Sequence, residues 1–97
     1  MALFLVTYDL RKEGQDYGPL IKRLHELGAQ RVLLSTWLLP QRTGGGDVAV
    51  AIRNDLGRYL DNNDRFLAIE VKNAAAWHRC EMGDLDLKAL IERNAAP

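Results

Sequence analysis

The chain has 97 residues, 47% hydrophobic and 27% charged, which is enough for one globular domain with a modest core. Equal numbers of basic and acidic side chains leave no formal net charge, which argues against coating nucleic acid through bulk charge. The single cysteine, Cys80, excludes an internal disulfide and fits a reducing compartment. Neither a signal peptide nor an apolar run of membrane-spanning length is apparent, so we expect a cytoplasmic protein without a membrane partner.

The first predicted element is a short apolar strand, residues 2–8, which ends at Asp9 and leads into a charged loop. Asp9 therefore stands where a rigid element meets solvent, a common position for a functional residue. Two interpretations remain open. Asp9 is a catalytic carboxylate or metal ligand, or it forms a turn by accepting the backbone N–H groups of Arg11 or Lys12.

A helix and a second β-rich stretch follow. Asp16 is the expected N-cap of the helix and Gly28 the residue after its C-cap. The inward face of the helix repeats at helical spacing: Tyr17, Leu20, Ile21, Leu24 and Leu27. Residues 31–39 are rich in β-formers, and we expect the Ser35-Thr36 step to bend them or divide them into two strands.

The second half of the chain begins with a glycine-rich loop over residues 41–46. Residues 47–60 could form a strand on propensity, but their apolar spacing favours a helix with Asp47 as its N-cap. Residues 65–71 read as a further strand. The remainder, residues 73–97, forms a C-terminal extension with an edge strand or a turn and then a short helix.

This order of elements over residues 1–72 predicts an α+β fold, a ferredoxin-like βαββαβ sandwich. Two helices would cover one face of an antiparallel sheet and leave the other face open. An open sheet face that carries apolar residues favours dimerisation, so we expect a homodimer.

Several polar and aromatic side chains have both a functional and a structural interpretation. Ser35 is a candidate active-site group, or its hydroxyl satisfies the backbone of a bent strand. Trp37 and Trp77 could stack on bases, or they pack in the core or at an interface. His78 and Cys80 have no second ligand pair at the spacing of a zinc site.

Four short motifs recur in a known order: Tyr8-Asp9-Leu10, Asp16-Tyr17, Ser35-Thr36-Trp37-Leu38 and Asn63-Asp64-Arg65. Together they resemble the small CRISPR-associated subunit that partners the spacer integrase, and in particular a side branch of bacterial and phage proteins labelled SinR-like. The likeness covers about residues 2–72. It implies a ferredoxin-like homodimer in which Asp9 lies near the two-fold axis.

The resemblance also implies a function. Members of that family were also described as metal-dependent nucleases, so the resemblance implies that the chain binds RNA or DNA and is a divalent-metal-dependent endonuclease. By that resemblance Asp9 would be the catalytic residue and the ligand of Mg²⁺ or Mn²⁺, with Ser35 nearby as a hydrogen-bonding group. Arg11, Lys12 and Arg31 would contact phosphates, and an integrase-like protein would be a partner.

Whether the chain is an enzyme stays open at this point. One alternative is a toxin-like ribonuclease, similar to the virulence-associated protein D group, from a toxin–antitoxin system. Another is a non-enzymatic module that binds other proteins through its dimer or through an open sheet edge.

Overall fold

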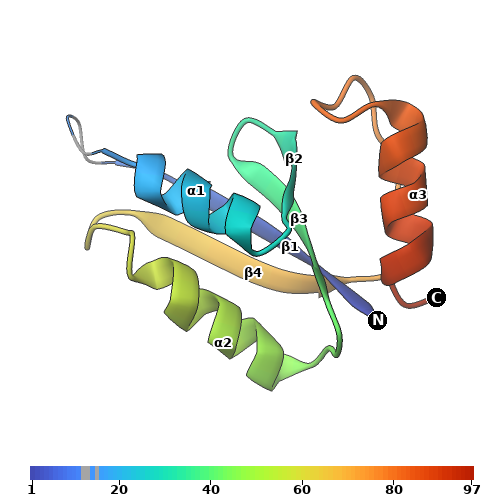
Figure 1. Cartoon of the computed structure of the whole chain (residues 1–97), viewed down its shortest axis with the longest axis horizontal. Coiled ribbons are helices and arrows are strands. Elements are labelled where there is room, and N and C mark those ends of the chain that lie inside the picture. The colour runs from blue at the N-terminus through green and yellow to red at the C-terminus, as the bar shows by residue number, and fades with distance from the viewer. Residues whose placement is uncertain (12–13, 15) are drawn as a thin grey trace.

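The computed structural model describes residues 1–11, 14 and 16–97, and its four strands form one antiparallel sheet in the order β2-β3-β1-β4. This is the strand order of a ferredoxin-like sandwich, so the predicted α+β, ferredoxin-like fold is confirmed. The elements, drawn in Figure 1, are β1 (Ala2–Asp9), α1 (Gly18–Glu26), β2 (Gln30–Leu33), β3 (Thr36–Gln41), α2 (Gly46–Gly57), β4 (Arg65–Val71) and α3 (Asp84–Asn94).

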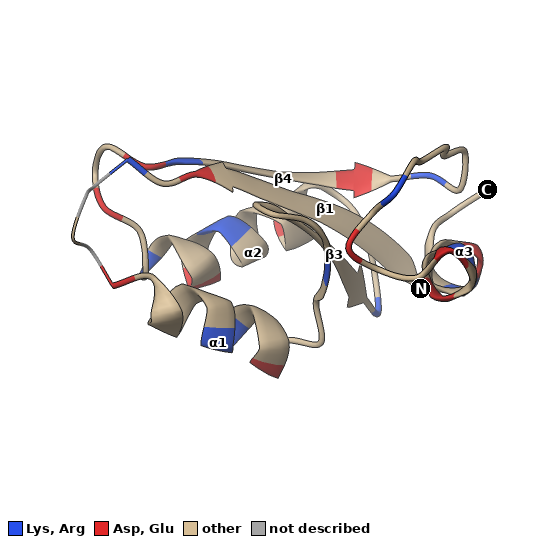
Figure 2. Ribbon diagram, turned by 90° about the horizontal axis from the view of Figure 1, so that it is seen from above, with Lys and Arg blue, Asp and Glu red and all other residues tan. Residues whose placement is uncertain are grey.

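The main core lies between the sheet and the helices α1 and α2, which cover the same face (Figure 2). Alternation along β1 sends every second side chain to that face. The predicted inward residues of α1 all belong to this core or pack against it. Its buried members are Ala2, Phe4, Val6, Tyr8, Leu20, Leu24, Ala29, Trp37, Leu39, Ile52 and Leu56.

The opposite face of the sheet is covered at one end only. There α3 packs over Leu3, Val32 and Leu38 and forms a second, smaller apolar cluster with them. Toward the Asp9 end of β1 this face is uncovered (Figure 2), and Leu67 and Ile69 of β4 remain 52% and 50% exposed. Leu67 and Ile69 form an uncovered apolar strip, and this strip is the part of the fold that bears on function.

The start of α1 differs from the prediction by about one residue. The helix begins at Gly18 with Tyr17 at the N-cap position, rather than with Asp16 there. The Asp16 carboxylate instead accepts the Gly18 N–H at 2.9 Å, which makes a turn just before the helix.

The predicted helix after the glycine-rich loop is present, but Asp47 is not its N-cap. Gly45 occupies that position with φ of +104°, a conformation that favours glycine, and Asp47 lies in the first turn. The carboxylate of Glu70 on β4 accepts the Gly45 N–H at 2.7 Å and holds the loop against the sheet.

The division of the second β-rich stretch is as predicted, since β2 ends at Leu33 and β3 begins at Thr36. Residues 73–83 contain neither the edge strand nor the helical turn that we expected. The C-terminal end of the chain nevertheless lies beside the residues that follow β4, because the Asn73 N–H donates to the Ala96 carbonyl at 2.8 Å.

Candidate functional site

Asp9 lies on the uncovered face of the sheet, at the end of β1. Its neighbour Tyr8 belongs to the main core, so strand alternation turns Asp9 the other way. The side chain is 67% exposed, and its Oδ2 lies 3.9 Å from Nη2 of Arg11. Of the two N–H groups predicted to form a turn with Asp9, that of Arg11 donates to Asp64 Oδ1 at 2.7 Å, and that of Lys12 lies outside the described residues.

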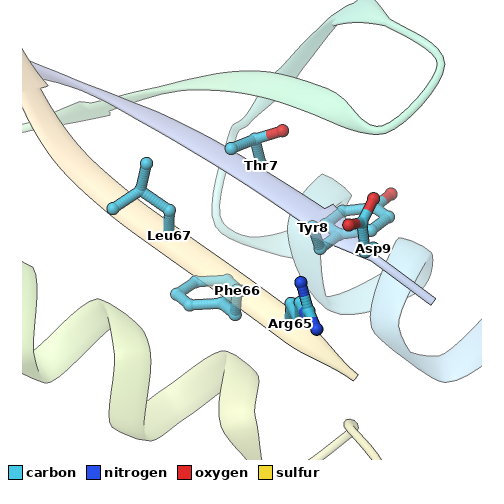
Figure 3. Close-up of a pocket in the computed structure, with 6 residues that line it drawn as sticks. All are labelled: Thr7, Tyr8, Asp9, Arg65, Phe66 and Leu67. Atoms are coloured by element: carbon cyan, nitrogen blue, oxygen red, sulfur yellow. The ribbon is translucent and has the colours of Figure 1, made fainter. Parts of the chain in front are cut away.

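Arg65 stands directly across from Asp9 in the register of β1 and β4. Side chains at opposed positions of an antiparallel pair are near neighbours. Between these strand ends lies an open hollow of about 240 Å³, shown in Figure 3 and lined by Thr7, Tyr8, Asp9, Arg65, Phe66 and Leu67. A carboxylate and two guanidinium groups, those of Arg11 and Arg65, therefore gather at the edge of an exposed apolar strip.

Asp64 organises the loops beside this hollow. Its carboxylate accepts the N–H groups of Arg11 and Asp61, each at 2.7 Å, and the hydroxyl of Tyr17 at 2.8 Å. These bonds tie the segment after β1 and the start of α1 to the turn before β4. They also place Arg11 beside Asp9. Sequence reasoning missed Asp64 and Arg65 as site residues, although both belong to one of the four motifs.

Ser35 lies beside the end of β1, because the Tyr8 N–H donates to its carbonyl oxygen at 3.2 Å. The structure therefore brings Ser35 close to Tyr8 through the backbone. The next hydroxyl, on Thr36, lies 2.9 Å from that of Thr7 across the strands. Thr36 is therefore satisfied by its cross-strand partner on the uncovered face.

Arg31 is not brought to Asp9. It is paired in register with Trp37, and its guanidinium lies 4.6 Å from the centre of that ring. Trp37 is fully buried and donates its indole N–H to Tyr8 Oη at 2.9 Å, so this tryptophan packs in the core and cannot stack on a base. The other predicted phosphate contact, Lys12, lies outside the described residues.

The described residues of a single copy do not form a divalent metal site by themselves. In the described residues no group of three or more His, Cys, Asp and Glu side chains is arranged to hold a metal ion. Mg²⁺ is usually held by one or two carboxylates together with substrate phosphates and water. Among the described residues, Asp9 supplies one carboxylate at this end of the sheet, next to the guanidinium groups of Arg11 and Arg65.

The strongest ion pairs of the described residues lie away from Asp9, between α1 and α2. Arg23 donates two hydrogen bonds to Asp55, at 2.9 and 2.7 Å, and Arg58 adds a third at 2.8 Å. The bond from Arg23 is the main reason that the pKa of Asp55 falls from 3.8 to about 2. This bridge joins the two helices of the covered face and has a structural role.

No protein-family model matches the chain, and no solved structure matches it. Within the described residues, no helix combines the length and apolar character needed to cross a membrane. The geometry of the sheet and of the residues at its Asp9 end is therefore the basis for inferring a function.

Proposed function

We propose that the chain forms a homodimer through the uncovered face of its sheet, and that the dimer binds the phosphodiester backbone of RNA or DNA. The observation that carries this proposal is the grouping of Asp9, Arg11 and Arg65 at the end of an uncovered apolar strip. One surface then offers both a contact for a second subunit and a contact for an anion.

The apolar strip supports the dimer. Leu67 and Ile69 occupy alternate positions of β4 on the uncovered face, and each is about half exposed. Covering the exposed half of such a side chain contributes on the order of 1 kcal/mol. A two-fold axis through this face would cover the strip on both copies at once.

The two arginines support phosphate binding. Guanidinium groups bind phosphate oxygens through paired hydrogen bonds, and Arg11 is 49% exposed beside Asp9. Two arginines and one carboxylate leave each site with a small positive charge. Binding should therefore be weak and sensitive to salt, in keeping with the absence of net charge on the chain.

Metal-dependent cleavage is the catalytic form of this proposal. Two Asp9 carboxylates, one from each subunit, would hold Mg²⁺ or Mn²⁺ between them, with Ser35 as a neighbouring hydrogen-bonding group. The ion would supply an oriented, activated water for attack on a phosphodiester. The chain would then belong with the CRISPR-adaptation subunits that its motifs resemble, and an integrase-like partner stays a prediction of that resemblance.

The mixed charge around Asp9 favours a second candidate. Acidic and basic residues both occur at this end of the sheet (Figure 2), where Asp9 lies beside Arg11 and across from Arg65. Such a surface suits a homodimeric module that binds another protein and performs no catalysis. Nucleic-acid binding separates the two candidates.

The test combines molecular mass with binding and cleavage of labelled single-stranded RNA and double-stranded DNA. We expect a dimer by light scattering, a monomer for Leu67→Lys, and binding that weakens as salt is raised. Arg65→Ala should weaken binding. Asp9→Asn should retain binding but lose cleavage in Mg²⁺ or Mn²⁺. The exposed variant Glu92→Gln, on α3, serves as the control.

Three results would decide against parts of this proposal. If the parent protein stays monomeric at high concentration, the proposed dimer is wrong, and so is the pairing of the two Asp9 carboxylates. Asp9→Asn protein that cleaves as well as the parent removes the catalytic role of Asp9. A dimer that binds no nucleic acid at low salt favours the protein-binding module.

A further inference from the structure

The two edges of the sheet are protected to different degrees. Strand β2 is short, its register shifts between Arg31 and Leu33, and its Val32 carbonyl accepts the Glu81 N–H of the C-terminal extension at 2.9 Å. Strand β4, by contrast, has seven residues without proline, and its pairing with β1 is regular throughout. In the described part of the chain β4 pairs with β1 alone. Such an edge is a template for another strand.

A hollow follows the outer edge of β4. It has a volume of about 200 Å³ and lies between this strand and α2. Its lining is mostly apolar, and Val50 of α2 is 44% exposed there. The lining residues are Ala49, Val50, Arg53, Phe66, Leu67 and Ala68. A strand added to β4 would direct every second side chain to the α2 side, where the hollow would receive an apolar one.

Two arginines lie near the Arg65 end of this edge, whereas the acidic residue of β4, Glu70, lies toward the other end and accepts the Gly45 N–H. Arg53 lines the hollow and bonds only the side-chain oxygen of its neighbour Asn54, at 3.2 and 3.3 Å, within the described residues. Arg65 begins β4 and forms no ion pair in the same part of the chain. None of the described residues that line the hollow is acidic. A ligand with carboxylates beside an apolar side chain would complement this arrangement.

We propose that the edge of β4 binds an extended acidic peptide from another protein by strand addition. The peptide backbone would pair with β4, one apolar side chain would enter the hollow beside α2, and acidic side chains would meet Arg53 and Arg65. Backbone pairing supplies affinity in this mode, and the hollow and the arginines supply specificity. The proposal is independent of the dimer, which uses the face of the sheet rather than its edge.

The experiment selects peptides that bind the full chain from a displayed random library. One selected peptide is then synthesised. Its affinity is measured by fluorescence anisotropy, and the site that it protects is located by amide hydrogen exchange. We expect a consensus with an apolar residue, one Asp or Glu at an alternate position to face Arg53, and another Asp or Glu at an odd spacing to face Arg65 on the opposite side of the sheet. The synthetic peptide should slow exchange of β4 amides. A consensus with helical spacing, no enriched peptide, or protection that appears on α3 instead of β4 overturns the proposal.

Charge reversal gives the sharper control. Arg53→Glu should weaken the synthetic peptide about tenfold, and a peptide with lysine in place of the facing acid should recover most of that loss. Arg93→Glu, a matched reversal on α3, should leave binding unchanged. Equal loss in both variants would show that general charge attraction explains the binding. Protection of β4 that rises with protein concentration, without peptide, would assign this edge to a second copy of the chain.

Discussion

The Asp55 carboxylate joins the two helices that cover the sheet, and replacing it with asparagine tests the value of that connection. Both of its oxygens accept hydrogen bonds from Arg23, and the side chain is 25% exposed. Arg58 adds a further bond from the solvent side. A paired guanidinium–carboxylate contact that is partly shielded from water belongs to the stronger class of surface ion pairs.

The expected loss follows from the pKa of Asp55. Its fall from 3.8 to about 2 corresponds to about 2.5 kcal/mol at about 1.36 kcal/mol per pKa unit. Because part of the side chain is in water, screening reduces this to about 1–2 kcal/mol for Asp55→Asn at neutral pH. For a domain of this size the melting temperature should fall by roughly 5–10 °C.

The pH dependence of the same variant has a definite sign. The pKa of Asp55 is lower in the folded protein than in the unfolded chain, so the stabilisation is fully present above about pH 4. It is lost as the pH falls toward 2, where the folded carboxyl takes up its proton. Parent and Asp55→Asn should therefore differ in unfolding free energy at neutral pH and converge near pH 2.

Urea denaturation followed by circular dichroism at several pH values measures this difference. Glu92→Gln is the control, because its contact with Lys88 is 3.9 Å long and both side chains are 63% exposed. We expect that variant to change the unfolding free energy by less than about 0.5 kcal/mol. A difference for Asp55→Asn that stays constant from neutral to acid pH would refute the electrostatic reasoning, since it would have to arise from packing.

Three further predictions concern the residues that hold the sheet and its loops. Tyr8→Phe removes the acceptor of the buried Trp37 N–H and should lower the unfolding free energy by about 1–2 kcal/mol, with a shift in tryptophan fluorescence; an unchanged stability would contradict this. Gly45→Ala places a Cβ at φ of +104° and should cost about 1–2 kcal/mol in thermal unfolding, whereas Gly57→Ala, in the last turn of α2 with open space at its Cβ, should not. Asp64→Asn weakens the acceptor of the Arg11 N–H and should reduce nucleic-acid affinity; equal affinity would show that Arg11 needs no such positioning.

The fold could be predicted because its signals are local. Helical spacing in α1 and apolar alternation in the strands each depend on residues close in sequence, and the order of elements then limits the topology. The errors at the helix starts also have a local cause. Asp16 bonds Gly18 ahead of the helix, and Gly45 takes a backbone conformation that gives the cap position to glycine.

The site was harder to predict because it depends on pairing between distant strands. Arg65 lies across from Asp9 because of the register of β1 and β4. Asp64 accepts a hydrogen bond from the N–H of Arg11, which is 53 residues away in sequence. The resemblance implied that Arg31 contacts phosphate, but its register with Trp37 places it on the covered face. The charge of a residue in or near a strand does not reveal on which face of the sheet its side chain lies.

The two proposed surfaces meet at Arg65, and this common corner links them energetically. Leu67 has its side chain on the uncovered face and also lines the hollow at the outer edge of β4, whereas Arg65 would meet phosphate on one surface and a peptide carboxylate on the other. One guanidinium cannot satisfy both anions fully, so an acidic peptide at the edge should weaken nucleic-acid binding, and the coupling must be reciprocal. Titration of the selected peptide into a complex with labelled RNA measures this effect. The coupling should largely vanish in Arg65→Ala, and coupling of full size in that variant would show that the two ligands interact by another route.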